Sequence, residues 1–141
     1  MEDQLFQKFI RFTTAVHEIT TDMTKGINVD SVTPIQYRIL EYIYVSEDVT
    51  LSQISECINM SMPNASREVK KLTGKELCEK ITDNQDRRKQ YIRLSTKGQT
   101  CMDIAFQEIE VRFKQRIESL TEDELLQVGK ALDLLQTKVF H

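Results

Sequence analysis

The chain has 141 residues, of which 40% are hydrophobic and 29% are charged, and its formal net charge is -3. These proportions are ordinary for a globular protein, and a chain of this length can bury a core without disulfides or metal ions. No stretch is apolar over the ~18 residues that a membrane-spanning helix needs, and the N-terminus lacks the basic segment of a secretion signal. We therefore expect one domain, or one domain with appended helices, in the cytoplasm and away from membranes.

The few cysteines and histidines have no spacing that binds metals or makes disulfides. Cys57, Cys78 and Cys101 are odd in number and far apart, and His17 and His141 are the only histidines. We expect each cysteine to be a small buried hydrophobe, and a redox-sensing thiol is the alternative. The sequence has no glycine-rich phosphate loop, nucleophile motif or cluster of metal ligands, so it indicates neither an enzyme nor a cofactor.

A long helix is predicted over residues 3–25. Its apolar residues recur at alternating steps of four and three, which makes a heptad-like seam suited to packing on other helices. The seam consists of Leu5, Phe9, Phe12, Val16, Ile19 and Met23. Gly26 is expected to end the helix, and an irregular link over 27–32 follows.

Three shorter helices are predicted next, each opened by a side chain that can cap a helix. Thr33 pairs with Gln36, and Thr50 pairs with Gln53, at the spacing of a capping box. Ser61 can cap the third helix, and a proline is tolerated in the first turn that follows. We therefore expect a helix to start directly after each of these capping residues.

The third of these helices has two contrasting faces. Ala65, Val69 and Leu72 form a small apolar stripe that can pack on a core. Polar and basic side chains gather on and beside the opposite face, at about 100° per residue: Pro63, Asn64, Ser66, Arg67, Lys70 and Lys71. Helix, tight turn and helix over 50–73 match a helix-turn-helix, whose second helix enters the major groove of DNA.

A basic hairpin follows this helix. Alternating residues over roughly 77–82 and 90–95 predict two strands, and the loop between them holds three adjacent cations, Arg87, Arg88 and Lys89. A narrow cationic loop can reach into a minor groove, as the wing of a winged helix does. Either basic surface alone is commonly just solvated, but the two together predict binding of double-stranded DNA.

The distribution of charge supports the same prediction. Residues 67–97 hold ten Lys or Arg and five Asp or Glu, a balance of +5, whereas the rest of the chain holds nine and seventeen, a balance of -8. A local field of this kind attracts nucleic acid even when the whole chain is acidic. A protein-interaction module is the alternative, because winged helices also bind proteins and the total charge is negative.

Two more long helices are predicted, over 97–119 and 121–140. Both carry apolar seams, and Thr121 with Glu124 forms a capping box at the start of the last helix. Together with the helix over 3–25, they present more apolar surface than a small winged helix can cover. We therefore expect another surface to bury these seams.

Three motifs in the central region carry a family resemblance. They are Thr33-Pro34-x-Gln36-Tyr37-x-Ile39-Leu40, Ser66-Arg67-x-Val69-x-x-Leu72, and Asp83-x-x-Asp86-Arg87-Arg88 followed by Leu94-Ser95-x-Lys97-Gly98. They are similar to the second helix, the recognition helix and the wing of the MarR family of transcriptional regulators, and the likeness covers nearly the full chain. The family usually has glycine at position 76, where this chain has Glu76, so the end of the recognition helix between Thr73 and Leu77 stays open.

The resemblance implies a mainly α fold with a small β-hairpin. The fold would be a winged helix-turn-helix with N- and C-terminal dimerisation helices, divided into residues 1–32, 33–96 and 97–141. Two chains would pair through their terminal helices into a homodimer that represses transcription from a pseudo-palindromic operator. Asp86 would brace the wing by pairing with arginine, and Arg88 would enter the minor groove.

The resemblance also implies a small aromatic effector, bound between the dimerisation helices and the winged helix. Phe12, Val16, Tyr37 and Tyr44 are candidates to line such a pocket, and ordinary core packing is the alternative for all four. Redox-sensing members of the family commonly use a cysteine in the first helix, which this chain lacks. A redox-sensing regulator would therefore have to use one of the later cysteines.

Overall fold

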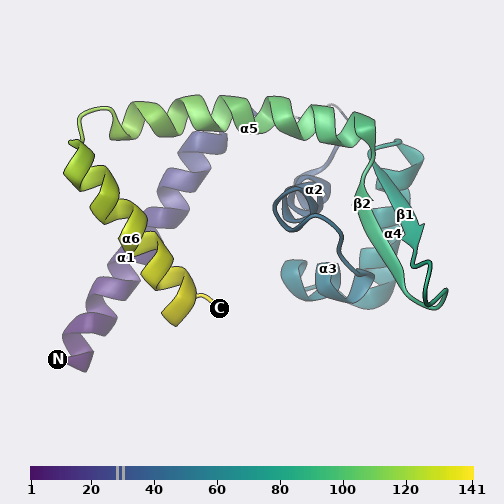
Figure 1. Ribbon diagram of the computed structural model, residues 1–141, viewed down its shortest axis with the longest axis horizontal. Helices are drawn as coiled ribbons and strands as arrows, with labels where there is room; N and C mark the ends of the chain where they lie inside the picture. The colour runs from purple at the N-terminus through teal and green to yellow at the C-terminus, as the bar shows by residue number, and fades with distance from the viewer. Residues whose placement is uncertain (28, 30) are drawn as a thin grey trace. The chain divides into compact units, whose positions relative to one another are not determined.

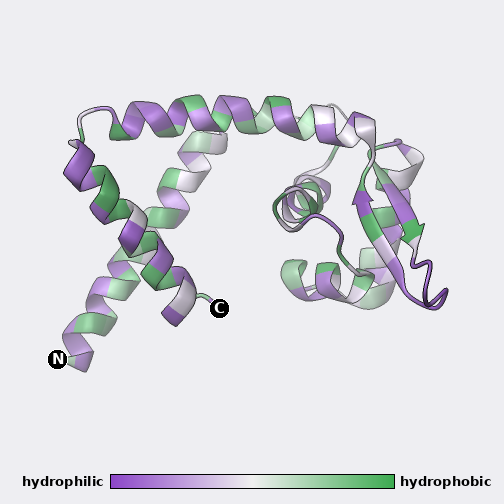
Figure 2. Ribbon diagram, viewed as in Figure 1, coloured by the Kyte–Doolittle hydropathy of each residue, from purple (hydrophilic) through white to green (hydrophobic). Residues whose placement is uncertain are grey.

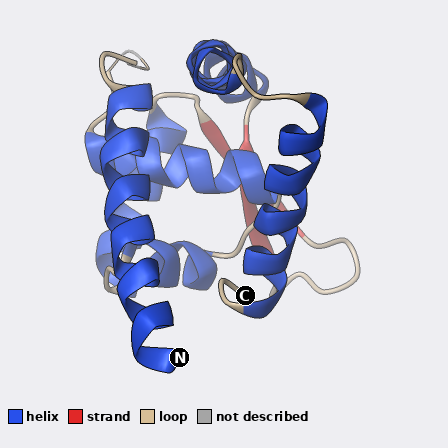
Figure 3. Ribbon diagram, turned by 90° about the vertical axis from the view of Figure 1, so that its left-hand side faces the viewer, coloured by secondary structure: helices blue, strands red, loops and turns tan. Residues whose placement is uncertain are grey.

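The structure, a computed structural model, describes residues 1–27, 29 and 31–141. These residues form six helices and one antiparallel pair of strands (Figure 1; strands in red in Figure 3). In chain order the elements are α1 (Glu2–Thr24), α2 (Pro34–Ser46), α3 (Leu51–Ile58), α4 (Met62–Gly74), β1 (Cys78–Thr82), β2 (Gln90–Leu94), α5 (Thr96–Ile117) and α6 (Glu122–Lys138). The predicted mainly α fold with a small hairpin is confirmed. Part of the predicted link over 27–32 lies outside the described residues.

The chain divides into two compact units. Gly26–Gln107 forms one, here called the winged-helix unit, and Met1–Lys25 with Glu108–His141 forms the other, here called the helical unit. Helix α5 contributes to both units, so the boundary expected at residue 97 falls at the start of this helix and not at the division between the units. Among the described residues, no helix has the length and apolar character that crossing a bilayer requires.

The winged-helix unit has an aliphatic core around α2. This helix supplies Ile39, Leu40 and Ile43, each at most 1% exposed. The apolar stripe on α4 is buried as predicted, and α3, β2 and α5 add further side chains, namely Ile54, Ile92 and Met102. A fully buried side chain of this size contributes about 1.5–3 kcal/mol to stability. The core therefore fixes α3, α4 and the hairpin around α2.

The predicted caps define where the helices begin. Reciprocal capping boxes are present at Thr33 for α2, Thr50 for α3 and Thr121 for α6. The Ser61 hydroxyl accepts a hydrogen bond from the Asn64 backbone amide at the start of α4. Because each cap satisfies donors that a helix start leaves free, these four helix starts could be predicted to the residue.

The hairpin leads directly into α5 through a close backbone contact. Strands β1 and β2 pair in the register Cys78↔Leu94 to Thr82↔Gln90. The backbone amide of Gly98 then donates to the Ser95 hydroxyl at 2.9 Å. A Cβ added at Gly98 would lie 2.0 Å from the Leu77 carbonyl oxygen. Glycine is therefore needed here because the first turn of α5 touches the backbone where β1 begins.

The helical unit, in contrast, has no buried residue. Its internal contacts include a stacked pair, Phe9 on α1 and Phe140 after α6, with ring centroids 5.9 Å apart. The Arg112 guanidinium of α5 donates to the carbonyl oxygens of Met23 and Lys25 at the end of α1, at 2.8 and 2.7 Å. Hydrophobic residues recur along its helices, where the ribbon is green in Figure 2. Many of their large side chains are exposed, among them Leu5, Phe6, Ile10, Phe12, Val16, Leu126, Leu132 and Leu134.

The three thiols differ in their surroundings. Cys78 is buried, Cys101 is half-buried and Cys57 is exposed. The prediction of a buried cysteine is therefore confirmed for Cys78 and wrong for Cys57, which lies on the polar side of the short helix α3. Burial raises the pKa of the Cys78 thiol to about 12. At neutral pH Cys78 is protonated, and it acts as an apolar core side chain.

Candidate nucleic-acid interface

Helix α4 presents a polar and basic surface to solvent. The side chains expected on this surface are exposed, apart from Ser66, which is half-buried: Pro63, Asn64, Arg67, Lys70 and Lys71. The Arg67 guanidinium donates to the Asn64 side-chain oxygen at 3.4 Å, one turn earlier on the helix. Arginine and asparagine are the side chains that most often read guanine and adenine edges in the major groove. This surface therefore has the chemistry to contact bases.

Glu68 lies beside this surface, and its negative charge reduces the net positive charge there. Its carboxylate pairs with the Lys71 ammonium at 3.3 Å and accepts a hydrogen bond from the Gln36 side-chain amide at 3.0 Å. The hydrogen bond from Gln36, followed by the interaction with Lys71, lowers the pKa of Glu68. Glu68 therefore remains ionised at neutral pH, and it holds Lys71 on one side of the helix.

The end of α4, which the sequence left open, is a Schellman turn without glycine. The backbone amide of Leu77 donates to the Leu72 carbonyl, and that of Glu76 donates to the Thr73 carbonyl, each at 3.0 Å. Glu76 has a φ of 63°, in the left-handed region that glycine adopts most easily. The helix thus ends as it would with glycine at position 76, but with a strained residue in the turn.

The wing is a short hairpin with an ordered basic loop. Its backbone closes through hydrogen bonds from Asp83 to the Lys89 carbonyl and from Lys89 to the Asp86 carbonyl, at 2.9 and 3.0 Å. The Asp86 carboxylate accepts from the backbone amide of Arg88 at 3.0 Å and from its guanidinium at 3.3 Å. Arg87, Arg88 and Lys89 are all exposed, and the Arg88 side chain is 93% exposed.

These contacts give Asp86 the geometry of a brace. One carboxylate oxygen accepts from both the backbone amide and the guanidinium of Arg88, so it restricts this exposed loop residue. Such a surface pair adds little to stability. Its effect is to reduce the conformational freedom of the loop.

Within the winged-helix unit, α4 and the wing are adjacent. Strand β1 contacts α4 directly, and the two lie side by side in Figure 1. Ser66 and Gln90 line a hollow of about 50 Å³ together with Lys80, so Ser66 faces the hairpin. On the strands, the Arg93 guanidinium pairs with the Glu79 carboxylate across the hairpin at 2.6 Å. The basic helix surface and the basic loop therefore belong to one packed unit.

The four candidate effector residues divide between the two units. Phe12 and Val16 are exposed on α1, in the helical unit. Tyr44 on α2 stacks on Phe106 with ring centroids 4.5 Å apart, and its hydroxyl donates to Asp103 at 3.0 Å. The Tyr37 hydroxyl is buried without a hydrogen-bond partner among the described residues, and burial, followed by the charge of Glu41, raises its pKa.

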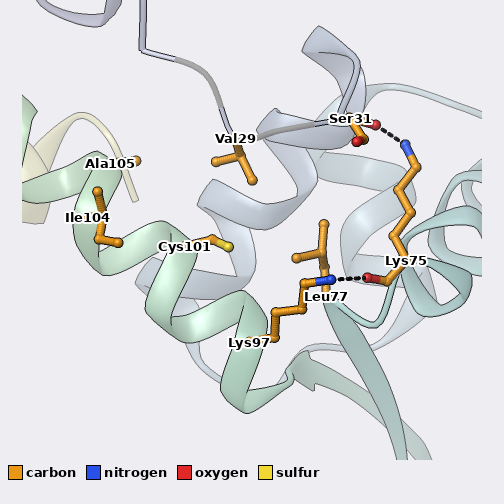
Figure 4. A pocket seen from close by; sticks show the side chains of 8 residues that line it. All are labelled: Val29, Ser31, Lys75, Leu77, Lys97, Cys101, Ile104 and Ala105. Atoms are coloured by element: carbon orange, nitrogen blue, oxygen red, sulfur yellow. Dashed lines mark hydrogen bonds between the residues drawn. The ribbon is translucent and has the colours of Figure 1, made fainter.

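A larger cavity lies elsewhere in the winged-helix unit. It has a volume of about 510 Å³. Its walls come from the segment before α2, the segment between α4 and β1, and the N-terminal part of α5. The lining residues are Val29, Ser31, Lys75, Leu77, Lys97, Cys101, Ile104 and Ala105 (Figure 4). Two ammonium groups border it: Lys75 donates to the Ser31 carbonyl, and Lys97 donates to the Lys75 carbonyl at 3.4 Å. The cavity combines apolar walls with positive charge, and no sequence signal pointed to it.

Comparisons with known proteins agree with this geometry. The sequence profile of the MarR family matches residues 32–89, which span the helix-turn-helix and the wing loop. The regulator MhqR of Bacillus subtilis strain 168, described as an HTH-type transcriptional regulator, is 27% identical over 143 residues, and the match covers 100% of this chain and 99% of MhqR. The chain is thus similar in sequence to the MarR family over this central region. These matches support a transcription regulator that binds DNA.

Solved structures show the same fold over the whole chain. A MarR family protein from Bacillus stearothermophilus superposes with a TM-score of 0.82 at 15% identity, covering 100% of this chain and 99% of that protein. NadR in complex with 4-hydroxyphenylacetate gives a TM-score of 0.70 at 18% identity and covers 92% of both chains. The fold inferred from the sequence motifs is thus the fold of these regulators.

Proposed function

We propose that this chain is a MarR-type transcription regulator, a cytoplasmic homodimeric repressor that binds a pseudo-palindromic operator. Helix α4 would read the major groove through Arg67, with Pro63, Asn64, Ser66, Lys70 and Lys71 around it. The wing would place Arg88 in the flanking minor groove, braced by Asp86, with Arg87 and Lys89 on the phosphates. The single observation that carries the proposal is that both basic surfaces are exposed on one compact unit.

The helical unit supports the homodimer. A compact part of a protein that buries none of its residues has no core of its own, and exposed apolar side chains line its helices. Monomeric proteins rarely leave such surface uncovered. A second copy of the chain would cover it, and a two-fold dimer presents two recognition helices about 34–36 Å apart, at successive major grooves.

Selection of bound fragments from random duplex DNA tests this proposal. Half-sites one helical turn apart predict a two-fold symmetric site of roughly 16–20 base pairs. If each chain neutralises about 4 phosphates, the logarithm of the affinity should fall with the logarithm of salt concentration with a slope of about -7. Enrichment of an asymmetric site, or of no site, would contradict binding of a homodimer to two symmetric half-sites.

A small aromatic acid is the proposed effector, and the cavity beside Lys75 and Lys97 is its proposed site. The related NadR structure holds 4-hydroxyphenylacetate. Pockets for ligands of drug size have volumes of about 300–1,000 Å³, and the cavity of about 510 Å³ lies in this range. Its lysines would pair with a carboxylate, while Leu77 and Ala105 would contact a ring. A pocket lined by Phe12, Val16, Tyr37 and Tyr44 is the alternative site.

Thermal-shift measurements with 4-hydroxyphenylacetate and benzoate separate these sites. The cavity predicts that Lys97→Ala abolishes the stabilisation by the ligand while Tyr44→Ala keeps it, and the aromatic pocket predicts the reverse. Absence of stabilisation of the parent protein by both compounds would exclude aromatic acids of this size as effectors.

A further inference from the structure

Two capping boxes of identical chemistry differ in what their glutamines contact. At the start of α3, the Gln53 side chain is exposed, and among the described residues its oxygen accepts only from the Thr50 backbone amide, at 2.9 Å. At the start of α2, the Gln36 side chain accepts in the same way from the Thr33 backbone amide, at 3.2 Å. Gln36, however, is 2% exposed, and capping a helix does not require burial.

The buried Gln36 amide has two further partners. Its nitrogen donates to the Glu68 carboxylate at 3.0 Å, and its oxygen accepts from the Lys75 ammonium at 2.8 Å. Hydrogen bonds in which one partner is ionised are roughly twice as strong as neutral ones. The amide nitrogen thus contacts a negative group and the amide oxygen contacts a positive group. This pairing fixes the orientation of the amide.

Both charged partners belong to the recognition helix. Glu68 lies in the middle of α4, and Lys75 is the C-cap residue of the same helix. Seven residues separate them, which is about two turns, or about 10 Å at 1.5 Å per residue. Two attachment points on one helix restrict its rotation and its sliding more than one point would.

We propose that Gln36 is a positioning residue for DNA reading, which holds α4 in register with α2 through Glu68 and Lys75. Gln36 is too buried to touch DNA itself. Its effect would reach the DNA because Glu68 also pairs with Lys71, and because the segment it fixes carries Arg67 and Lys70. Bidentate contacts to base edges depend on placement of the helix, whereas attraction to phosphates depends mainly on charge.

The test compares Gln36→Met with Gln53→Met. Both substitutions remove one capping-box hydrogen bond at nearly constant volume, and neither changes the charge, but only Gln36→Met removes the two attachments to α4. The measurement is the ratio of affinities for the selected operator and for a random duplex of the same length at one salt concentration. The inference rests on the proposed function for this DNA readout.

The expected result is a ratio lowered roughly tenfold in Gln36→Met, which corresponds to about 1.4 kcal/mol, because both attachments between Gln36 and α4 are lost. Gln53→Met should keep the parent ratio, and affinity for the random duplex should stay unchanged in both. An unchanged ratio in Gln36→Met, or an equal loss in Gln53→Met, would overturn the proposal.

Hydrogen exchange of the free protein provides a readout without DNA. The amides of α4 should exchange faster in Gln36→Met than in Gln53→Met, and equal rates would count against the proposal. If the parent protein itself does not discriminate between duplexes, the proposed function fails while this comparison still tests the role of Gln36.

Lys75→Met covers the case in which Gln36→Met does not fold, because Lys75 is only half-buried. It should lower the operator-to-random ratio in the same direction. Loss of a phosphate contact would instead lower the affinity for both duplexes equally. It would also reduce the slope of log affinity against log salt concentration by about 0.9 per chain. That second pattern would overturn the proposal.

Discussion

The two units of this chain are both built from capped amphipathic helices, yet only the winged-helix unit has a core. Its central side chains, such as Ile39, Leu40 and Ile54, are fully buried, whereas no residue of the helical unit is buried. A unit that buries its own apolar residues can hold the geometry of a binding surface. A unit that does not leaves apolar surface uncovered, and the proposed homodimer would cover it.

The largest effect is expected from charging the uncovered helices. Leu132→Glu places a carboxylate in the exposed apolar seam of α6, where Leu132 is 54% exposed. The homodimer should dissociate in sedimentation experiments. Operator affinity should fall at least ~100-fold, because linking two binding modules typically gains 10²–10⁴ in affinity.

Val45→Glu is the matched control for this variant. Val45 is an exposed apolar residue on α2, in the unit that has its own core, and it is 71% exposed. The same change there should leave the dimer intact. A monomeric Val45→Glu, or a dimeric Leu132→Glu, would remove the distinction between the units.

Gly98→Ala tests how tightly the winged-helix unit is packed. The new Cβ would meet the Leu77 carbonyl oxygen at 2.0 Å, so α5 and β1 must separate. Overpacking of this kind should lower the free energy of unfolding by about 3 kcal/mol, measured by denaturant titration. Gly74→Ala is the control, because an added Cβ at Gly74 has no neighbour within 4 Å. Equal stability of the two variants would contradict the close contact.

Glu76→Gly should stabilise the same unit. A side chain in the left-handed region costs about 1–2 kcal/mol, and the greater chain entropy of glycine offsets about 0.5–1 kcal/mol of this. The net gain should be about 0.5–1 kcal/mol, seen as a rise of about 2–4 °C in Tm. Asn59→Gly, at another left-handed position, should gain less because asparagine tolerates this conformation. A larger rise in Tm for Asn59→Gly than for Glu76→Gly would contradict backbone strain at Glu76.

The sequence predicted features that depend on neighbours along the chain. The capping boxes at Thr33, Thr50 and Thr121 fixed helix starts, because each box is a local arrangement of four residues. For the same reason the apolar stripe of α4 predicted its buried face, and the alternating residues predicted the two strands of the hairpin. The MarR-family resemblance then joined these local elements into the correct fold.

Features that depend on distant segments were not predictable in this way. The sequence predicts the capping hydrogen bond of Gln36 but not its hydrogen bonds to Glu68 and Lys75, because these two partners lie more than thirty positions away along the chain. The reason for glycine at position 98 and the cavity beside Lys97 likewise arise where separate elements meet. The exposure of Cys57 depends on which side of α3 packs on the core, and its residue type alone gave the wrong answer.

Operator binding by the double variant Arg67→Ala/Arg88→Ala tests the two reading surfaces most directly. Each good base contact contributes about 1–3 kcal/mol of discrimination, and a dimer would lose four arginines. Fluorescence anisotropy with the selected operator should therefore give an affinity at least ~100-fold weaker than that of the parent protein, with an unchanged dimer mass and Tm. A folded, dimeric double variant that binds the operator as the parent does would contradict the assignment of α4 and the wing to DNA.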